Sequence, residues 1–260
     1  MSAGTVKPGA GTFAPAPGRA PMRTIIGRQI RMELLLTARR GEAVVLAMGV
    51  PLLVLLGAGL FEVTNLPTDD RLGFVVPGVL ALTVMSTAFT GQAITTGYER
   101  SYGVLKRLGA SPLTRPGLLL AKTAAVLVQI VAQVLVLGLV GFAVGWRPHG
   151  DQLLPAIAAT VLAAAGYSGL ALLLASVLKP ETTTGAATLI YVLMLSVGGI
   201  MFAAPDLGTA GWFLLPLAAH AEALRATLLY DASVPFTIWL SLGAWAVVWL
   251  TAAARNFRWE

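Results

Sequence analysis

Side chains able to carry acid–base chemistry gather in one part of the sequence. His220 and Glu222 lie two residues apart, with Asp206 and Asp231 nearby. A histidine beside a carboxylate is a common arrangement for general acid–base catalysis. No nucleophile and no metal-ligand spacing accompanies them, so they are more typical of a solvated helix face, on which Glu222 and Arg225 pair at i, i+3 spacing. We therefore predict no catalytic residue, and keep a membrane enzyme acting at the outer surface through His220 and Glu222 as the alternative.

Other reaction chemistries lack their residues. Cysteine is absent, and the two histidines, His149 and His220, are too far apart in sequence for a motif such as HExxH. We expect no metal site. A phosphate cradle of the form GxxxxGK[ST] is also missing, so any ATP must be handled by another chain. The sequence predicts that this chain binds no cofactor.

One polar stretch, Gly97 to Arg115, separates two strongly apolar segments. Leu105 and Leu108 stand at i, i+3 spacing, which predicts a short helix with one apolar stripe. Gly109 and Pro112 then end that helix. An amphipathic helix between two membrane segments needs a surface to dock against, and a cytosolic partner protein is the expected one. The alternative is that its positive charges only set the orientation of the chain in the membrane.

Composition places the chain in a membrane. Of the 260 residues, 57% are hydrophobic and only 12% are charged, and the mean hydropathy is +0.79. Soluble domains carry about twice that share of charged residues. The net charge of +6 does not indicate nucleic-acid binding, because the positive residues lie in the short segments that flank apolar runs.

The predicted fold is an all-α integral membrane protein with six transmembrane helices, each apolar run reaching or approaching about 20 residues. We expect a disordered cytoplasmic tail over residues 1–21 and a basic amphipathic helix lying in the headgroup layer over residues 22–40. The expected spans, none of which contains Asp, Glu, Lys or Arg, are 43–61, 74–98, 123–146, 152–178, 182–205 and 235–254. Charge-free spans argue against an ion-coupled transporter.

The distribution of Lys and Arg predicts the orientation. With the N-terminus inside, the inside segments hold seven basic residues before the first span, five in the first loop up to Lys122, one in the next inside loop and two at the C-terminus. These are fifteen of the 18, so both termini are expected in the cytoplasm of a multi-pass protein of the cell membrane.

Three features concern the membrane region itself. The apolar part of the outer segment between the fifth and sixth spans, 207–219, is too short to cross the bilayer and suits short re-entrant helices. Small residues at i, i+4 spacing, Gly141 with Gly145 and Ala165 with Gly169, predict close helix packing within the subunit or across a dimer. Polar side chains within the spans either line a path for an amphipathic substrate or bond neighbouring helices. The candidates for such a path are Thr87, Thr90, Gln92, Gln129 and Gln133.

The polar stretch resembles the first cytoplasmic loop of the membrane subunits of ABC-2 type exporters. The likeness rests on Glu99 closing a span, Gly103, the Leu105-x-x-Leu108 pair, and Ser111-Pro112 followed by a basic residue. A second likeness lies further on, in Gly198 to Pro205, Leu215-Pro216 and Leu224-Arg225. Together these loose motifs cover most of residues 22–260.

The resemblance implies a function. In such exporters the loop rests on a separate ATP-binding subunit, which holds ATP and Mg²⁺, and two permease subunits form a homo- or heterodimer. The residues expected in this coupling role are Glu99, Arg100, Gly103, Leu105, Lys106, Arg107, Leu108 and Pro112. Among the members, drug exporters of the daunorubicin-resistance type are the most similar, and exporters of glycans or haem share the architecture. The predicted cargo is an amphipathic drug-like or lipid-like molecule. Membrane lipids are expected as further partners, and nucleic acid is not.

Overall fold

The computed structural model describes residues 20–39, 41–60, 66, 68–149, 151–200 and 208–256. These residues form helices and their connections, with no strand among them. Residues 1–19 of the predicted tail and Pro205 with Asp206 lie outside the described residues. The elements in chain order are α1 (Met22–Arg39), α2 (Gly41–Leu60), α3 (Arg71–Met85), the π-helix η1 (Ser86–Gly91), α4 (Gln92–Ser101), α5 (Val104–Gly109), α6 (Arg115–Ala143), α7 (Leu153–Val177), α8 (Pro180–Val197), α9 (Gly208–Leu214), α10 (Pro216–Leu228) and α11 (Phe236–Asn256).

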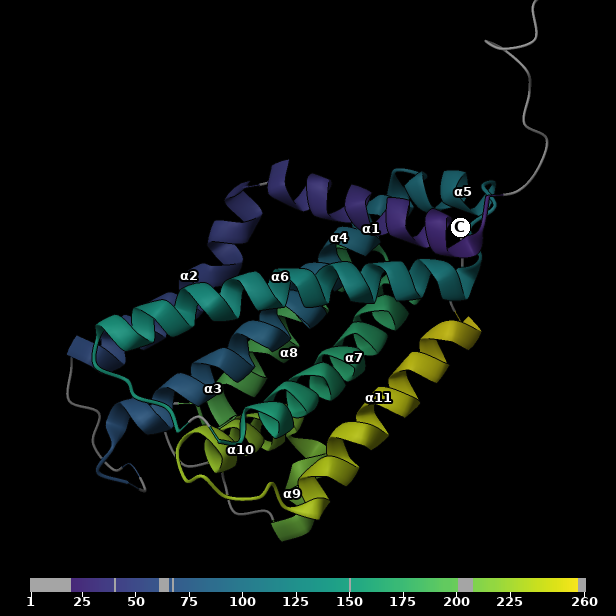
Figure 1. Ribbon diagram of the computed structural model, residues 1–260. Coiled ribbons are helices and arrows are strands. Elements are labelled where there is room, and N and C mark those ends of the chain that lie inside the picture. The colour runs from purple at the N-terminus through teal and green to yellow at the C-terminus, as the bar shows by residue number, and fades with distance from the viewer. Residues whose placement is uncertain are drawn as a thin grey trace, which may run out of the picture.

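The long helices pack into one bundle whose two ends differ (Figure 1). Helices α1 and α5 lie at the end where the chain finishes after α11, and α9 and α10 lie at the opposite end. The continuous run of α3, η1 and α4 forms the middle of the bundle, because it packs against α2, α6, α7, α8 and α10. Of the most apolar 18-residue stretch of this run, 94% is buried inside the bundle. Side chains on this run are therefore surrounded by the rest of the chain.

Among the residues that the structure describes, four helices are long and apolar enough to cross a membrane. They are 71–101, formed by α3, η1 and α4, and Arg115–Ala143, Leu153–Val177 and Phe236–Asn256. The predictions of an all-helical fold and of membrane-spanning helices are confirmed to this extent. The other two expected spans coincide with α2 and α8, and the end of the fifth, 201–205, lies outside the described residues. The count of six spans stays a prediction.

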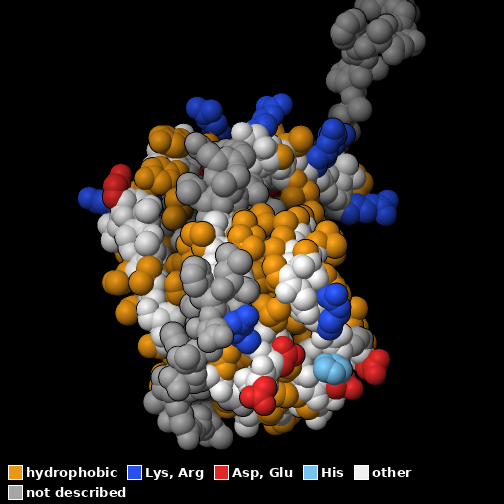
Figure 2. All heavy atoms as spheres, turned by 90° about the vertical axis from the view of Figure 1, so that its left-hand side faces the viewer, with side chains coloured by type: hydrophobic (Ala, Val, Ile, Leu, Met, Phe, Trp, Pro, Cys, Tyr) orange, Lys and Arg blue, Asp and Glu red, His pale blue; other side chains and the backbone are white. Residues whose placement is uncertain are grey.

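The surface of the bundle explains how it lies in lipid. Apolar side chains cover the middle of the face shown in Figure 2, and Lys and Arg project from its upper end. On α6 the outward face carries Val131, Leu135 and Leu139, whose exposed fractions are 59%, 62% and 70%. Water would oppose such exposure, whereas hydrocarbon tails accept it. The long helices therefore present large apolar side chains on the outside of the bundle as well as burying others inside it.

Helices α7 and α11 pack closely against each other, and small residues make the approach possible. A Cβ on Gly169 would lie 2.6 Å from the backbone nitrogen of Leu250, and one on Gly166 would lie 3.2 Å from that of Ala246. Close packing at Gly169 was expected either within the subunit or across a dimer, and the structure shows packing within the subunit. Gly145 does not belong to a packing face, because α6 ends at Ala143 and Gly145 turns the chain with φ of +106°.

The ends of α3 and α6 are fixed by local chemistry. The Asp70 side chain accepts a 2.8 Å hydrogen bond from the amide of Gly73, and Thr114 does the same for Gly117 at 3.2 Å. Both satisfy amides that the first helical turn leaves unpaired. The third predicted span began at Thr123, but this cap starts α6 eight residues earlier, at Arg115. Lys122 therefore lies inside a helix and not in the loop to which the charge pattern assigned it.

Candidate functional site

A pocket opens where α1, the η1–α4 run and α6 meet. Helix α1 contributes Leu36 and Thr37 to its lining, and α6 contributes Ala125 and Val126. The volume of the cavity is about 100 Å³. It combines an apolar wall with polar and charged side chains from all three helices, which is the composition of a site for a small amphipathic group.

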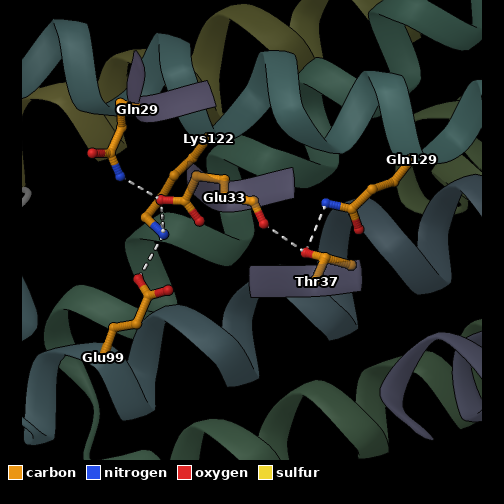
Figure 3. Close-up of polar contacts among 6 residues, drawn as sticks. All are labelled: Gln29, Glu33, Thr37, Glu99, Lys122 and Gln129. Atoms are coloured by element: carbon orange, nitrogen blue, oxygen red, sulfur yellow. Dashed lines mark hydrogen bonds and ion pairs between the residues drawn. The ribbon is translucent and has the colours of Figure 1, made fainter. Parts of the chain in front are cut away.

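The centre of the pocket is a buried three-membered charge cluster, Glu33–Lys122–Glu99 (Figure 3). Lys122 Nζ lies 3.0 Å from Glu33 Oε1 and 2.6 Å from Glu99 Oε2. The exposed side-chain fractions are 3% for Lys122, 12% for Glu33 and 8% for Glu99. Gln29 Nε2 also donates a 2.8 Å hydrogen bond to Glu33 Oε1. The cluster joins α1, α4 and α6 through charges that hardly meet solvent.

Helical spacing explains why these residues converge. On α1, Gln29, Glu33 and Thr37 follow one another at intervals of four and share one face (Figure 3). On α6, Lys122 and Gln129 are seven residues apart and also share a face, on which Gln129 Nε2 donates to Thr37 Oγ1 at 3.3 Å. Two polar contacts, Glu33–Lys122 and Thr37–Gln129, therefore lie along the seam between α1 and α6.

Four of the five residues predicted to line a substrate path border this pocket: Thr87, Gln92, Gln129 and Gln133. Thr87 Oγ1 donates a 2.6 Å hydrogen bond to Gln133 Oε1, so this pair bonds two helices. Gln92 is 5% exposed, and neither its amide nitrogen nor its amide oxygen has a hydrogen-bond partner. Thr90 does not border the pocket, and its buried hydroxyl is also without a partner. Contact of these residues with a substrate stays a prediction.

The π-helix η1 borders the same pocket through Thr87 and Gly91. A π-helical turn places one extra residue in the helix, and such insertions are frequent at functional sites. Beyond η1, Gln92 and Glu99 are seven residues apart on α4, and both turn toward the pocket. Gly91 itself is exposed, so the backbone of the middle helix is open at the pocket mouth.

The predicted coupling stretch forms the expected short helix, but its apolar stripe is used differently. Leu105 is 1% exposed and packs with Leu113, Leu118, Leu172 and Ala253 of the same chain. The expectation that Leu105 is free to dock a partner is corrected here, because α5 folds back onto α6, α7 and α11. The outward face carries Lys106 and Arg107, with Tyr102, Ser111 and Pro112 also exposed, while Leu108 is half-buried.

Residues on either side of α5 hold it in place. Gly103 joins α4 to α5 with φ of +69°, a conformation that favours glycine. Arg100 Nη1 donates to the carbonyl oxygens of Ala175 at 2.9 Å and Leu178 at 3.3 Å. These carbonyls end α7, where a positive charge is favoured by the helix dipole. Arg100 thus fastens the coupling stretch to the end of α7.

At the opposite end of the bundle, Arg225 of α10 ties three elements together. Its Nε donates to the carbonyl of Phe74 at 3.0 Å, its Nη2 donates to that of Gly199, and its Nη1 lies 3.6 Å from Glu222 Oε2. The guanidinium also lies 3.7 Å above the Phe74 ring. Burial lowers the pKa of Arg225 to about 10, so the side chain stays charged at neutral pH. The predicted pairing of Glu222 with Arg225 is present.

The acid–base cluster around His220 is not formed as a surface site. His220 is 0% exposed, its Nε2 lies 3.3 Å from Thr160 Oγ1, and burial lowers its pKa to about 3. A buried neutral imidazole cannot exchange protons with a substrate at the membrane surface. Asp206 lies outside the described residues, and within the described part no three His, Asp or Glu side chains gather as a metal site. The membrane-enzyme alternative therefore loses its central residue.

The charge cluster was missed by sequence reasoning. The sequence pattern assigned Glu33 to a basic amphipathic helix and Lys122 to a charged loop. Two signals were available: Glu33 is the only acidic residue in 22–40, and Lys122 is the only charged residue in the largely apolar run from Gly117 to Val128. Isolated charges in apolar surroundings usually have a partner, although the sequence alone does not say which one.

Comparison with known proteins identifies the family. A search among curated proteins gave no match. The sequence matches the family model described as "ABC-2 type transporter" over residues 25–229, which covers most of the chain and includes the pocket, the coupling stretch and Arg225. The drug-exporter subgroup suggested by the resemblance is not distinguished by this match. The chain is a multi-pass membrane protein of the ABC-2 type transporter family and constitutes a transporter membrane domain.

Proposed function

We propose that this chain is the permease subunit of an ATP-driven exporter that moves an amphipathic drug-like or lipid-like molecule out of the cytoplasm or the inner leaflet. A separate subunit binds and hydrolyses ATP, and two permease chains form the complete pathway. The family assignment supports the transport role. In orientation, α1, α5 and the end of α11 face the cytoplasm, in line with the excess of Lys and Arg predicted for the inner segments.

The observation that carries the proposal is how α5 is attached to the bundle. Its outer face offers Arg107 to a partner, while its inner face inserts Leu105 among residues of α6, α7 and α11. A force applied to α5 by a closing ATP-binding subunit therefore reaches three spanning helices through one packed cluster. If this segment were a solvated loop that did not pack on the bundle through Leu105, the same displacement would not be passed on to the spanning helices.

The chemistry of the pocket supports the cargo class. Its lining mixes Leu36, Ala125 and Val126 with hydroxyl, amide and carboxylate groups, and it lies between α1 and the middle helix. If α1 lies in the headgroup layer, as its basic face predicts, molecules in the inner leaflet reach this pocket sideways. Long hydrophilic glycans would gain little from the apolar wall. We therefore favour drug-like or lipid-like export, as in the daunorubicin-resistance type.

The test uses charge reversal on the outer face of α5. Arg107→Glu should abolish stimulation of the partner ATPase by the reconstituted permease, because it places repulsion at the docking face without disturbing Leu105. Arg255→Glu is the matched control, since Arg255 is also exposed and lies at the same end of the bundle. Thermal unfolding of both variants should equal that of the unmodified protein. Normal ATPase stimulation by Arg107→Glu would remove α5 from the coupling role.

A further inference from the structure

The uncharged polar side chains that line the pocket between α1, α4 and α6 do not all have the same role. Thr87 Oγ1 donates to Gln133 Oε1 at 2.6 Å, and Gln129 Nε2 donates to Thr37 Oγ1 at 3.3 Å. Each of these two bonds joins one helix to another. These four side chains therefore contribute to the packing of the bundle, and their hydrogen bonds are explained within the chain.

Gln92 and Thr96 line the same pocket and are different. Their exposed fractions are 5% and 1%. Within the part of the chain that the structure describes, neither polar atom of the Gln92 amide has a hydrogen-bond partner, and the Thr96 hydroxyl has none either. The two residues are four positions apart on α4, so they lie on one face of that helix. An amide and a hydroxyl that bond nothing else therefore border the cavity together.

Unpaired groups in this position indicate what the cavity receives. Buried polar groups of native proteins are nearly always hydrogen-bonded, because a buried group without a partner has lost its water and gained nothing in return. Where such groups border a cavity, a molecule inside the cavity can complete their bonds. The occupant of this pocket must therefore bring hydrogen-bonding atoms to Gln92 and Thr96.

The chemistry of the Gln92 amide defines the kind of group that fits. Its oxygen needs a donor and its nitrogen needs an acceptor, and the Thr96 hydroxyl can serve as either. An ammonium group only donates and would leave the Gln92 nitrogen unpaired, whereas a carboxylate only accepts and would leave the oxygen unpaired. A carboxamide or a hydroxyl does both, and it carries no charge that would have to be removed from water.

The size and the border of the pocket favour a head group over a whole molecule. Its volume of about 100 Å³ corresponds to about three water molecules at roughly 30 Å³ each, which suits a group of a few heavy atoms. Leu36 and Gly91 are lining residues that are also exposed, and they mark the mouth. Met32, one turn before Leu36 on α1, is 54% exposed. An alkyl or ring portion therefore has an apolar surface on α1 against which to lie.

We propose that this pocket binds the uncharged head group of an amphiphile, a carboxamide or a hydroxyl that pairs with Gln92 and Thr96, with the apolar portion along α1 at the mouth. The inference rests on the proposed function and names the class of head group that its cargo carries. A drug-like amide or alcohol and a neutral lipid such as a diacylglycerol share this chemistry.

The experiment uses a dodecanamide that carries a photoreactive diazirine on its alkyl chain, added to the full chain in phosphatidylcholine nanodiscs. After irradiation, mass spectrometry locates the label, which we expect on α1 around Met32 and Leu36. Unlabelled dodecanamide, dodecylamine (protonated at pH 7) and dodecane then compete at matched concentrations in the bilayer. Dodecanamide should displace the label at a concentration at least ten times lower than either of the others.

A further competitor separates the two sources of the head group. Dioleoylglycerol mixed into the nanodiscs should displace the label if a neutral membrane lipid occupies the pocket. Lack of displacement by dioleoylglycerol, together with displacement by dodecanamide, would assign the pocket to a smaller amide or alcohol. Both results support binding of an uncharged head group.

Two variants with matched controls test the residues. Gln92→Met removes both polar atoms of the amide and Thr96→Val removes the hydroxyl at nearly constant shape, and each should raise the dodecanamide concentration needed for displacement at least tenfold. Gln152→Met and Thr251→Val make the same changes outside the pocket and should have no effect. Without ligand, Gln92→Met should unfold at the same or a higher temperature, because it removes an unpaired buried amide.

Three results would overturn the proposal. Equal displacement by dodecanamide, dodecylamine and dodecane, or a displacement that Gln92→Met leaves unchanged, would mean that only water fills the pocket. A Gln92→Met variant that unfolds at a clearly lower temperature would mean that the amide bonds other parts of the chain. The assay needs neither ATP nor a partner, so its failure leaves the ATPase test of the proposed function independent.

Discussion

At the scale of single residues, two buried cations connect elements that are far apart in the sequence. Lys122 holds α1, α4 and α6 together, and Arg225 holds α3, α10 and the turn at Gly199. Each is almost completely buried and each contacts groups from at least two other elements. Since apolar contacts discriminate little between neighbouring helices in a membrane, such polar contacts define which faces meet.

Removal of Lys122 should show how much the cluster depends on it. Lys122→Met leaves Glu33 and Glu99 buried without their shared cation, which typically costs about 3–5 kcal/mol. We expect a large drop in resistance to unfolding by SDS in mixed micelles. The triple variant Glu33→Gln, Glu99→Gln, Lys122→Met should recover part of that loss, because no charge then remains unpaired. Equal stability of the single variant and the unmodified protein would mean that Lys122 does not stabilise the folded state through Glu33 and Glu99.

His220 should make folding stability depend on pH. Its pKa is about 3 in the folded protein against an ordinary value near 6.5. Between these values the unfolded chain binds a proton that the folded chain excludes, so this contribution to stability is full above pH 6.5 and falls as pH decreases toward 3. The loss is about 1.4 kcal/mol for each pH unit.

The measurement compares unfolding of the unmodified protein and His220→Gln at pH 7.5 and pH 5.5. Other groups titrate equally in both, so the difference in pH dependence isolates His220. A variant that loses stability on acidification as steeply as the unmodified protein would show that His220 is solvated in the folded state.

At the scale of elements, helices α7 and α11 approach through glycine where larger residues would separate them. A Cβ at Gly169 would meet the backbone of α11 at 2.6 Å, whereas one at Gly185 of α8 would meet nothing within 4 Å. Backbone atoms cannot yield as a flexible side chain can. The two positions therefore form a matched pair of helical glycines with opposite surroundings.

Alanine substitution at these two sites should change the free energy of unfolding in opposite directions. Gly169→Ala forces α7 and α11 apart and should destabilise the protein by about 1–3 kcal/mol. Gly185→Ala should stabilise it by about 0.5–1 kcal/mol, because alanine favours the helix and has room. Thermal unfolding in one detergent measures both. A stabilising Gly169→Ala would contradict the close packing of α7 on α11.

The sequence was most successful in predicting where the helices lie. Long apolar runs fix where helices lie, so residues 152–178 and 235–254 anticipated α7 and α11 within two residues at each end. The failures have local causes: the Thr114 cap starts α6 before its apolar run begins, and the π-turn at η1 leaves no pattern in composition. Leu105 was placed on the correct stripe, but an amphipathic pattern does not say whether the apolar face meets another protein or the same chain. The pairing of Glu33 with Lys122 could not be predicted, because the two residues are 89 positions apart in the sequence.

At the scale of the whole molecule, the two ends of the bundle perform different tasks. One end carries α1, α5 and the charged pocket, and the other closes with α9 and α10 around Arg225 and His220. The middle helix runs between the ends and contains η1 beside the pocket. Under the proposed function, movement received at α5 reaches the pocket over a short distance, and the buried end around Arg225 is where a path toward the outside must open.

The central claim is that this chain works with a separate ATP-hydrolysing subunit, and affinity purification tests it most directly. The tagged chain is isolated from its native membrane in mild detergent, and the proteins that accompany it are identified and quantified. The account predicts a soluble subunit bearing GxxxxGK[ST] in about equal amount, whose recovery falls sharply with Arg107→Glu and not with Arg255→Glu. A chain that purifies alone, in a preparation that hydrolyses no ATP, would contradict it.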